Sequence, residues 1–432
     1  MLEGLHHRQE LGIHPPQFVI TKVLEEMRNF VATPAEENIL MVALMDKMKE
    51  ADLPEDEQKR IALEAREAIE TTAYPAYTRL IDFFEELDEE VEGNYGAWSL
   101  PDGEEYYRLA LKLFTTTDYT PEFIHQMGLA EIDRIQAEIL AILESEGWDV
   151  SSGFTAAIEE MSENPMFYYS DSGEGRDQIL ADYQAMIDEI SEGLEPYFDV
   201  VPEAAVEVER VPEFKEKTSP GAYYNPPAMD GSRPGVFYAN LYDIKVTPKF
   251  HMRTLAYHEA IPGHHLQIAI AQELEGVPML RRYSGSTAFV EGWALYTERL
   301  CDEMGLYSAD LDRFGVLSFD AWRACRLVVD TGIHAFGWSR QQAIDYLYEN
   351  TLLARNNVEN EVDRYIAWPG QALAYKIGQR EILSLRDRAQ AELGPAFSYP
   401  EFHDHVLENG AVSLETLRSV VGSWIDDGPD AK

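Results

Sequence analysis

The chain has 432 residues, 45% of them hydrophobic, which is enough to bury a substantial core in one large domain or in two to three smaller ones. Its 35 basic and 78 acidic residues give a net charge of −43, and such a surface repels the phosphates of nucleic acids. No apolar run reaches the length of about eighteen residues that a transmembrane helix needs, so neither a nucleic acid nor a membrane is an expected partner.

The first sixteen residues, MLEGLHHRQELGIHPP, contain neither the basic nor the apolar segment of a secretory signal. The chain has two cysteines, Cys301 and Cys325, which are too few for a disulfide framework and lie in apolar segments of helical character. We expect both to be buried thiols, which fits a reducing compartment. We therefore predict a cytoplasmic protein.

Helical spacing of apolar residues dominates the first 200 residues. Segment 17–50 shows it clearly, because Ile20, Leu24 and Met27 follow one another at intervals of three or four. Several segments begin with residues that suit helix caps, and Pro121 suits the first turn of a helix. Helices are predicted over residues 17–50, 56–92, 104–115, 121–146, 154–161 and 175–195.

The pattern changes after Pro202. Residues 204–212 alternate between apolar and polar side chains, which is typical of a strand, and residues 222–225 and 236–241 are two further short strands. The turn-rich segment PPAMDGSRPG, residues 226–235, connects the last two. Helical character then returns and continues to the end of the chain.

These patterns predict a mainly α fold, in which a large helical domain carries a small β-sheet. We see no repeat and no clear linker, so we expect one continuous domain over residues 1–432. Residues 1–200 form its helical N-terminal part. Residues 201–432 hold the sheet and the helices that carry the motif described next.

The most distinctive segment is HEAIPGHH, residues 258–265. In the HExxH motif of zinc peptidases, two histidines four residues apart share one helix face and bind the metal, while the glutamate acts as a general base. Here the second histidine comes six or seven residues after the first. On a straight helix the sixth position points about 240° around the axis, and the seventh lies about 10 Å further along it. Neither could share a zinc ion with His258, because zinc–nitrogen bonds are about 2.0–2.1 Å long.

Pro262 and Gly263 resolve this conflict of spacing. Proline removes a helical hydrogen bond and clashes with the preceding turn, and glycine tolerates the backbone that results. If the two residues form a bulge, His264 takes the place of the second histidine, and His265 is the alternative. We therefore predict a zinc site held by His258 and His264.

A third ligand is expected on a neighbouring helix. The segment FVEGWALYTERL, residues 289–300, places Glu291 and Glu298 seven positions apart on one face of an apolar helix. A carboxylate is costly to bury in such surroundings unless it is paired or bound to a metal. We predict that Glu291 is the third ligand and that Glu298 is an outer partner or an alternative ligand.

The string HEAIPGHHLQ, residues 258–267, resembles the signature HExxPGHHxQ of the bacterial family called domain of unknown function 885. The resemblance covers nearly the whole chain. It includes the segments YNPP at 224–227, VEGWALY at 290–296, DTGIH at 330–334 and PGQALAYKIG at 369–378.

The family is similar in layout to gluzincin oligopeptidases such as thimet oligopeptidase. This resemblance implies a zincin-like fold, zinc on His258, His264 and Glu291, and Glu259 as the general base. It also implies that residues 236–241 form the edge strand of the sheet beside the active helix. Oligopeptidases of this type use a tyrosine to stabilise the reacting carbonyl oxygen. Tyr375 is the first candidate for that role, and the other candidates are Tyr365 and Arg380.

The resulting prediction is a zinc-dependent metallopeptidase that hydrolyses short peptides. A zinc hydrolase of a non-peptide amide or ester, and a non-catalytic metal-binding relative, are the alternatives. The substrate is expected to be a peptide or a small amide, and the oligomeric state stays open. His334 could line the cleft or be a core histidine, and His403 and His405 are expected to be structural.

Overall fold

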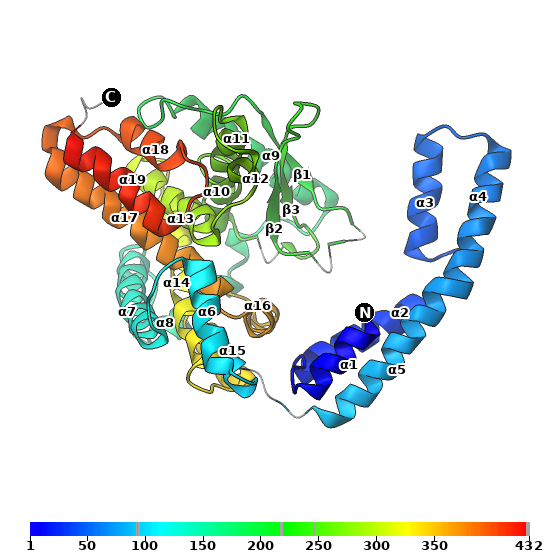
Figure 1. The fold of residues 1–432 in the computed structure, drawn as a ribbon. Helices are drawn as coiled ribbons and strands as arrows, with labels where there is room; N and C mark the ends of the chain where they lie inside the picture. Colours follow the sequence, from blue (N-terminus) through cyan, green and yellow to red (C-terminus); the bar gives the residue numbers. More distant parts are fainter. Residues whose placement is uncertain (92, 94–95, 214, 217–218, 245–246, 429–432) are drawn as a thin grey trace. The chain divides into compact units, whose positions relative to one another are not determined.

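The computed structural model describes residues 1–91, 93, 96–213, 215–216, 219–244 and 247–428. Contacts divide the chain into two compact units, Met1–Gly103 and Glu104–Lys432 (Figure 1). The sequence patterns predict one continuous domain with an internal change near residue 200 and no boundary near residue 103. The boundary arises because the apolar side chains of the first helices pack against one another and form clusters of their own.

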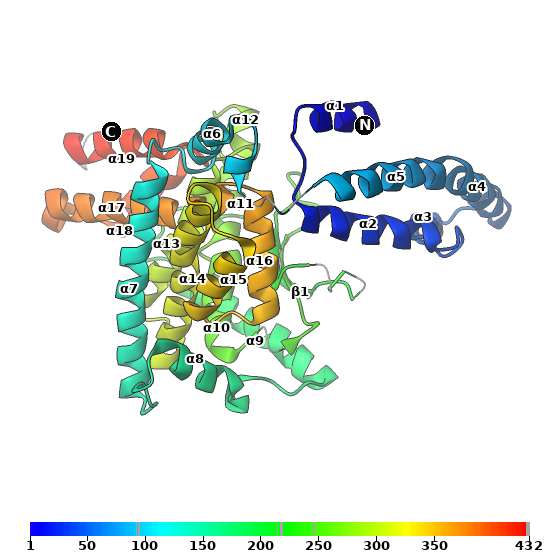
Figure 2. The same ribbon diagram turned by 90° about the horizontal axis from the view of Figure 1, so that it is seen from below.

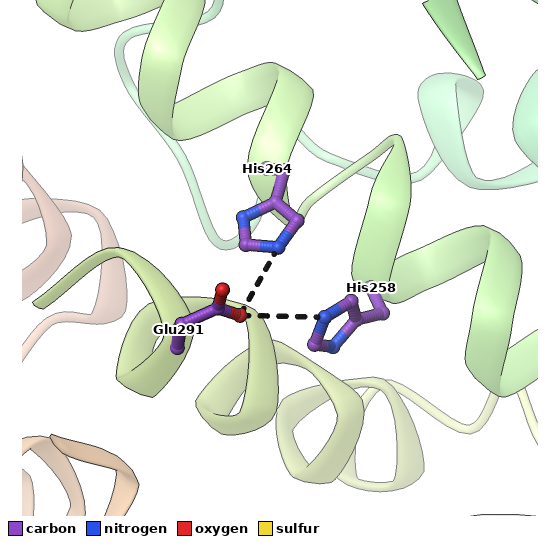
Figure 3. A group of neighbouring side chains, drawn as sticks. All are labelled: His258, His264 and Glu291. Atoms are coloured by element: carbon purple, nitrogen blue, oxygen red, sulfur yellow. Dashed lines mark ion pairs between the residues drawn. The ribbon is translucent and has the colours of Figure 1, made fainter. Parts of the chain in front are cut away.

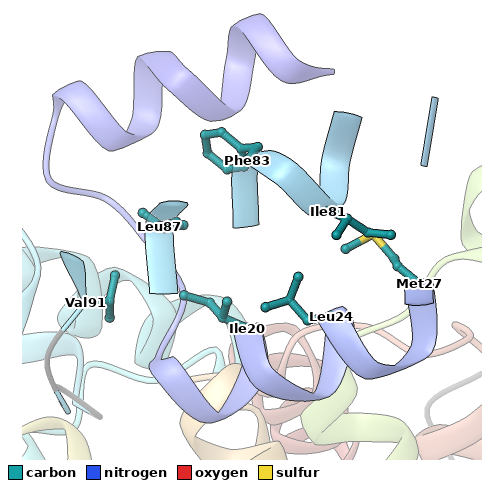
Figure 4. Packing of buried hydrophobic residues seen from close by; sticks show 7 residues of the cluster. All are labelled: Ile20, Leu24, Met27, Ile81, Phe83, Leu87 and Val91. Atoms are coloured by element: carbon teal, nitrogen blue, oxygen red, sulfur yellow. The ribbon is translucent and has the colours of Figure 1, made fainter. Parts of the chain in front are cut away.

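The first unit consists of helices joined by short turns. Its helices are α1 Leu2–Glu10, α2 Gln17–Ala32, α3 Ile39–Glu50, α4 Glu55–Ala68 and α5 Tyr74–Glu90. Helices α2 and α5 pack along each other. Figure 4 shows the cluster that these helices bury, in which Phe83 faces α1; it consists of Ile20, Leu24, Met27, Ile81, Phe83, Leu87 and Val91.

Two long helices predicted for this unit are interrupted. Segment 17–50 breaks between α2 and α3, since Pro34 disfavours a helical conformation of the residue before it and Thr33 is extended. Asn38 then caps α3, because its side chain accepts a hydrogen bond from the Leu40 N–H. In segment 56–92 a π-helical turn, Ile69–Ala73, joins α4 to α5, and position 92 lies outside the described residues.

The second unit contains the sheet and all the segments that resemble the family signature. Thr120 caps α7 by accepting the Phe123 N–H, and Pro121 occupies the first turn as predicted. The helices of this unit are α6 Gly103–Thr115, α7 Pro121–Ser145, α8 Phe154–Glu163, α9 Gly173–Glu192, α10 Lys249–Glu259, α11 His264–Glu273, α12 Met279–Tyr283, α13 Thr287–Glu303, α14 Asp310–His334, α15 Arg340–Glu349, α16 Arg355–Ala367, α17 Ala374–Leu393, α18 Tyr399–Leu407 and α19 Leu414–Asp427.

The sheet has three strands, β1 Val206–Arg210, β2 Ala222–Asn225 and β3 Gly235–Ala239, in the order β1-β3-β2. Strand β3 pairs parallel with β1 and antiparallel with β2. The prediction that residues 236–241 form an edge strand is therefore wrong. Strand β3 is almost entirely buried, as expected for a central strand, and the strand that contacts α10 is β2. The mainly α fold with a small sheet is confirmed.

Two pairs of long helices form the frame of this unit. Helix α7 packs along α14, and α13 packs along α17 (Figure 2). The second pair approaches closely at Gly292 and Gly378, where a Cβ atom added to Gly292 would lie 2.5 Å from the Cα of Gly378. This contact brings the preceding Glu291 and the nearby Tyr375 into the same region. Among the described residues, no helix is long and apolar enough to cross a membrane.

Candidate metal centre

The helix that begins at Lys249 breaks within the motif. Helix α10 ends at Glu259, and α11 begins at His264. Between them Ala260 and Gly263 leave the helical region, with ψ angles of −106° and −128°. The indole nitrogen of Trp293 donates a hydrogen bond of 2.9 Å to the carbonyl of Pro262, which ties the break to α13. The distortion expected from Pro262 and Gly263 is therefore present.

Gly263 is needed here because of a close approach of backbone to backbone. A Cβ atom at this position would lie 2.0 Å from the carbonyl oxygen of His258 and 2.3 Å from that of Tyr257. Separations below 3.0 Å essentially never occur for real Cβ atoms. Glycine thus allows α11 to fold back against the end of α10.

We expect Gly263→Ala to destabilise the fold by at least about 1–3 kcal/mol, because rigid backbone atoms must move to admit the methyl group. The movement would separate His258 from His264, so metal affinity should fall as well. Chemical denaturation and zinc titration measure the two effects. Gly173→Ala is the matched control, since a Cβ there meets no atom within 4 Å. Equal stability of the two variants would contradict this account of the break.

The break brings His258, His264 and Glu291 together (Figure 3). The Nε2 atoms of His258 and His264 lie 3.8 and 3.4 Å from Oε2 of Glu291. All three candidate ligand atoms lie within 4.8 Å of one another, so the group could hold a metal ion. The His258 side chain is 5% exposed, whereas those of His264 and Glu291 are 11% and 18% exposed, which leaves one side of the group accessible.

His264 and Glu291 each stabilise the charged form of the other. Burial alone would lower the pKa of His264, but the hydrogen bond and charge of Glu291 raise it above its ordinary value. Burial would raise the pKa of Glu291, but His264 and Tyr375 hold it below the ordinary value. The Oε2 atom of Glu291 is nevertheless buried without a well-formed hydrogen bond. A buried carboxylate oxygen of this kind needs a cation.

The structure separates the two histidines between which the sequence left a choice. His264 points its Nε2 atom toward Glu291. In contrast, His265 is fully buried and uses both ring nitrogens elsewhere, with Nδ1 2.9 Å from the Tyr224 hydroxyl and Nε2 2.9 Å from the carbonyl of Ala204. His265 therefore links α11 to the sheet region, and His264 is the candidate ligand.

Glu298 lies behind His258. Its Oε1 atom lies 2.7 Å from Nδ1 of His258 in hydrogen-bonding contact, which leaves Nε2 directed toward Glu291. Burial lowers the pKa of His258 well below its ordinary value, and the charges of His264, Arg323 and Arg326 act in the same direction. The imidazole is thus neutral, which is the form that binds metals. The expected outer partner is in place.

Glu259 lies beside the metal group at the end of α10 and is 9% exposed. Burial raises the pKa of its carboxyl, and the neighbouring charge of Glu291 acts in the same direction. The backbone of Tyr224 on edge strand β2 acts in the opposite direction on this pKa, and β2 packs against α10. The predicted general base therefore stands between the three candidate ligands and the edge strand.

Of the three residues considered for stabilising a reacting oxygen, Tyr375 lies nearest the metal group. It is one of the groups that hold the pKa of Glu291 below its ordinary value. Tyr365 is buried, and its hydroxyl is occupied by Arg326 and Glu361. Arg380 is exposed and forms an ion pair with Glu131 of α7, away from the metal group.

Sequence reasoning missed two buried cations of α14, Arg323 and Arg326, which are 4% and 3% exposed. Arg323 lies 3.7 Å from Glu298, and the Arg326 guanidinium lies 4.1 Å from the centre of the Tyr375 ring. The sequence signal that could have identified these arginines is the same one that identified Glu291, namely a charge within an apolar helical segment. Both are charged residues inside an apolar helical segment, where an unpaired charge is costly.

The other histidines and the two cysteines have structural surroundings. His334 is buried beside the Tyr365 carbonyl, 3.0 Å from its Nε2 atom. His403 bonds the Tyr197 carbonyl and the Tyr296 hydroxyl, and His405 pairs with Glu408 at 3.2 Å. Cys301 and Cys325 are buried free thiols, as expected.

A second buried carboxyl supports the turn that leads into α17. Asp330 accepts hydrogen bonds from the Tyr107 hydroxyl at 2.6 Å and from the Gly370 N–H at 3.1 and 3.2 Å. Gly370 has a φ of 82°, a left-handed conformation that favours glycine. Two segments of the family resemblance thus meet here. Burial raises the pKa of Asp330 to about 7.

Asp330→Asn should remove one pH-dependent contribution to stability. A carboxyl with a raised pKa stays protonated in the folded state, so its contribution is complete below the ordinary value of 3.8 and is lost as pH rises through about 7. Between pH 5 and 8, the difference in unfolding free energy between wild type and Asp330→Asn should change by about 2–3 kcal/mol. Urea denaturation at both pH values measures this change, and a constant difference would contradict it.

The fold and the site together define a mainly helical protein with a candidate metal centre of two histidines and a glutamate. The chain belongs to a family described as a bacterial protein of unknown function (DUF885), whose model matches residues 1–421. The resemblance inferred from the sequence motifs is thereby confirmed. The comparison with curated proteins found no match.

Two solved structures share the fold. A proposed lipoprotein from Colwellia psychrerythraea is 37% identical, with a TM-score of 0.94 over 98% of this chain and 72% of that one. A proposed lipoprotein of unknown function from Shewanella oneidensis is 20% identical, with a TM-score of 0.72 over 92% of this chain and 73% of that one. An M32 carboxypeptidase from Deinococcus radiodurans R1 gives 12% identity and a TM-score of 0.28, which is too low to support an argument.

These comparisons correct two expectations. The predicted cytoplasmic location is contradicted, because both of the similar structures are described as those of lipoproteins. That prediction rested on the first residues and on the two buried thiols, and neither determines the location of a protein, because targeting signals are short segments that a fold does not encode. The further similarity to thimet oligopeptidase receives no support from the comparisons.

Proposed function

We propose that this protein is a zinc-dependent metallopeptidase that hydrolyses short peptides. One observation carries the proposal, namely the convergence of His258, His264 and Glu291 with Glu259 directly beside them. A structural zinc site is usually closed by four protein ligands. Three ligands with an adjacent carboxylate leave room for water and substrate, which is the arrangement of a catalytic site.

The residues present fit a zinc ion. Two imidazole nitrogens and one carboxylate oxygen are a common donor set for catalytic zinc. Ligand atoms at zinc bond lengths of about 2.0–2.1 Å in tetrahedral geometry lie roughly 3.4 Å apart. The separations of 3.4 and 3.8 Å from Oε2 of Glu291 match that spacing. The buried Oε2 atom without a well-formed hydrogen bond supports a cation at this position.

Zinc bound here would lower the pKa of water and polarise the carbonyl of the scissile bond. Glu259 accepts a proton from the attacking water and passes it to the nitrogen of the leaving amine. Its raised pKa suits this exchange, because a group with a pKa nearer the working pH both takes and releases a proton. Glu298 keeps His258 in the required tautomer and orientation.

Tyr375 supplies a hydrogen bond to the carbonyl oxygen as negative charge develops on it. The Tyr375 hydroxyl lies close enough to Glu291 to lower the pKa of that carboxylate, which puts it beside the three candidate ligands. Burial raises the pKa of Tyr375 to about 12, so the hydroxyl keeps its proton for this role.

The same residues could hydrolyse a non-peptide amide or ester, and a relative without activity could retain the metal. The position of Glu259 favours an enzyme over the inactive relative, because a structural metal needs no general base beside it. Peptides are favoured over other amides because edge strand β2 packs against α10, the helix that carries Glu259, and an edge strand can bind an extended chain by main-chain hydrogen bonds.

The test is a mass-spectrometric screen of purified, zinc-loaded protein against a library of short peptides, with amide and ester substrates in parallel. We expect cleavage of peptides that a chelator abolishes and added zinc restores. Turnover of esters or amides without any peptide cleavage would overturn the peptidase assignment. Binding of zinc with no turnover of any substrate would overturn the enzyme assignment.

A further inference from the structure

Helix α14 places two arginines side by side against the candidate site. The guanidinium carbons of Arg323 and Arg326 lie 4.6 and 4.4 Å from the centre of the same ring, that of Trp322. Both side chains are nearly fully buried. Two like charges in such proximity repel each other and lose hydration, so the arrangement is costly unless an anion compensates it.

The hydrogen bonds of Arg323 are incomplete. Its Nη2 atom lies 3.7 Å from Oε1 of Glu298, which is too far for a hydrogen bond, and that oxygen already accepts from His258. Its Nη1 atom reaches the Phe319 carbonyl only at 3.4 Å. Its Nε atom is buried and has no hydrogen-bond partner among the described residues.

Arg326 also has an unused donor. Its Nε atom donates to the Tyr365 hydroxyl at 3.0 Å, and Nη2 donates to Oε2 of Glu361 at 3.2 Å. Its Nη1 atom is buried without a partner in the described part of the chain. Glu361 cannot neutralise Arg326 alone, because Arg364 holds the same carboxylate at 2.8 and 3.2 Å.

This arginine pair, Arg323 and Arg326, borders the reacting region. The Arg326 guanidinium lies 4.1 Å from the centre of the Tyr375 ring, and Tyr375 is one of the groups that hold the pKa of the candidate ligand Glu291 below its ordinary value. Beyond Arg326, the side chains of Arg364 and Glu361 are 30% and 20% exposed, so the group extends to the surface. The acidic groups nearest the pair, Glu298 and Glu361, are each shared with another partner, so a small anion here would face positive charge compensated only in part and unused N–H groups.

We propose that the arginine pair binds the free carboxylate at the C-terminus of the peptide substrate, and that the protein is an exopeptidase acting from that end. This inference rests on the proposed metallopeptidase function. A guanidinium binds a carboxylate through paired hydrogen bonds, and every unmodified peptide ends in such a group. The carboxylate would supply the negative charge and the acceptors that the pair lacks, with Arg326 as the main contact.

The experiment compares peptides of identical sequence that end either in a free acid or in an amide. With wild-type protein we expect kcat/KM for the free acid to exceed that for the amide by at least about 30-fold, the effect of a few charge-assisted hydrogen bonds. Arg326→Gln should reduce this ratio to near one by weakening hydrolysis of the acid alone. Arg326→Lys keeps the positive charge but loses the paired N–H donors of the guanidinium, so it should give an intermediate acid-to-amide ratio.

Arg386→Gln is the matched control. Arg386 is also a buried arginine with an unpartnered Nε atom, but its guanidinium binds Glu303 at 2.9 and 3.1 Å instead of facing the site. Its substitution should leave the acid-to-amide ratio unchanged. A second measurement needs no turnover. Calorimetry measures the binding of N-acetyl-Ala-Phe and of its amide to the zinc-loaded Glu259→Gln variant, and we expect the acid to bind more tightly.

The outcomes separate the two proposals. Absence of any peptide cleavage would overturn the metallopeptidase assignment. Cleavage of acid and amide at equal rates, or unchanged selectivity in Arg326→Gln, would overturn the carboxylate site and leave the peptidase standing. A preference for acidic side chains within the peptide, regardless of its C-terminus, would also overturn it.

Discussion

Glu259→Gln is expected to lower kcat by about 100- to 10,000-fold while the zinc content stays at that of the wild type. The amide has nearly the shape of the carboxylate, but it cannot take a proton from water. The fold and the metal ligands are therefore retained, and the loss falls on the chemical step.

The measurement combines steady-state kinetics on a peptide identified in the screen with elemental analysis of the same preparation. Glu392→Gln is the control, because Glu392 is a half-exposed glutamate whose partner is the surface residue Arg388. Its activity should equal that of the wild type. A Glu259→Gln protein with full zinc and more than about a tenth of wild-type kcat would rule out Glu259 as the general base.

His264→Ala should abolish stoichiometric zinc binding, whereas His265→Ala should keep it. His264 directs Nε2 at the metal position, and its loss leaves two of the three protein ligands. We expect affinity to fall by more than the roughly 10- to 100-fold that follows loss of an outer hydrogen-bonding partner. Activity should be lost with the metal.

His265→Ala removes two different hydrogen bonds, those to the Tyr224 hydroxyl and the Ala204 carbonyl. It should therefore reduce stability by about 1–3 kcal/mol without removing the metal. Thermal unfolding with and without a chelator distinguishes the variants, since a bound ligand stabilises the folded state. A chelator should lower the Tm of wild type and His265→Ala, and leave that of His264→Ala unchanged. The reverse pattern would assign the ligand to His265.

Much of the fold follows from local patterns in the chain. The helices that became α6, α7 and α8 and the short strand β2 were predicted to within two residues of their observed ends. Apolar spacing and caps determine such elements, and both are properties of a few neighbouring residues. The interruptions at Pro34 and at the π-helical turn were missed, because helical spacing can continue across a local break.

The position of the strands in the sheet depends on pairing between distant segments. The resemblance to oligopeptidases implies an edge strand beside the active helix, and residues 236–241 stand in that place just before the motif. Their near-complete burial and the register with both β1 and β2 make β3 central. The order of strands depends on which long-range contacts bury the most apolar surface, and spacing within one strand does not reveal it.

The sequence alone determined the components of the candidate site. The distance between His258 and His264 required a break in the helix, and Pro262 and Gly263 supplied it. The burial cost of a carboxylate identified Glu291 and Glu298. Each inference concerned one segment and the backbone geometry that its residues permit.

Only the tertiary structure decided between His264 and His265, since this depended on which ring nitrogens find partners in the sheet region. It also brought Arg323 and Arg326 of α14 to the same place as Tyr375 of α17. These residues lie about 50 positions apart along the chain, and their contact results from helix packing around the metal group. Apolar spacing shows which face of a helix is buried. It does not show which other helix packs against that face, since this depends on the tertiary structure.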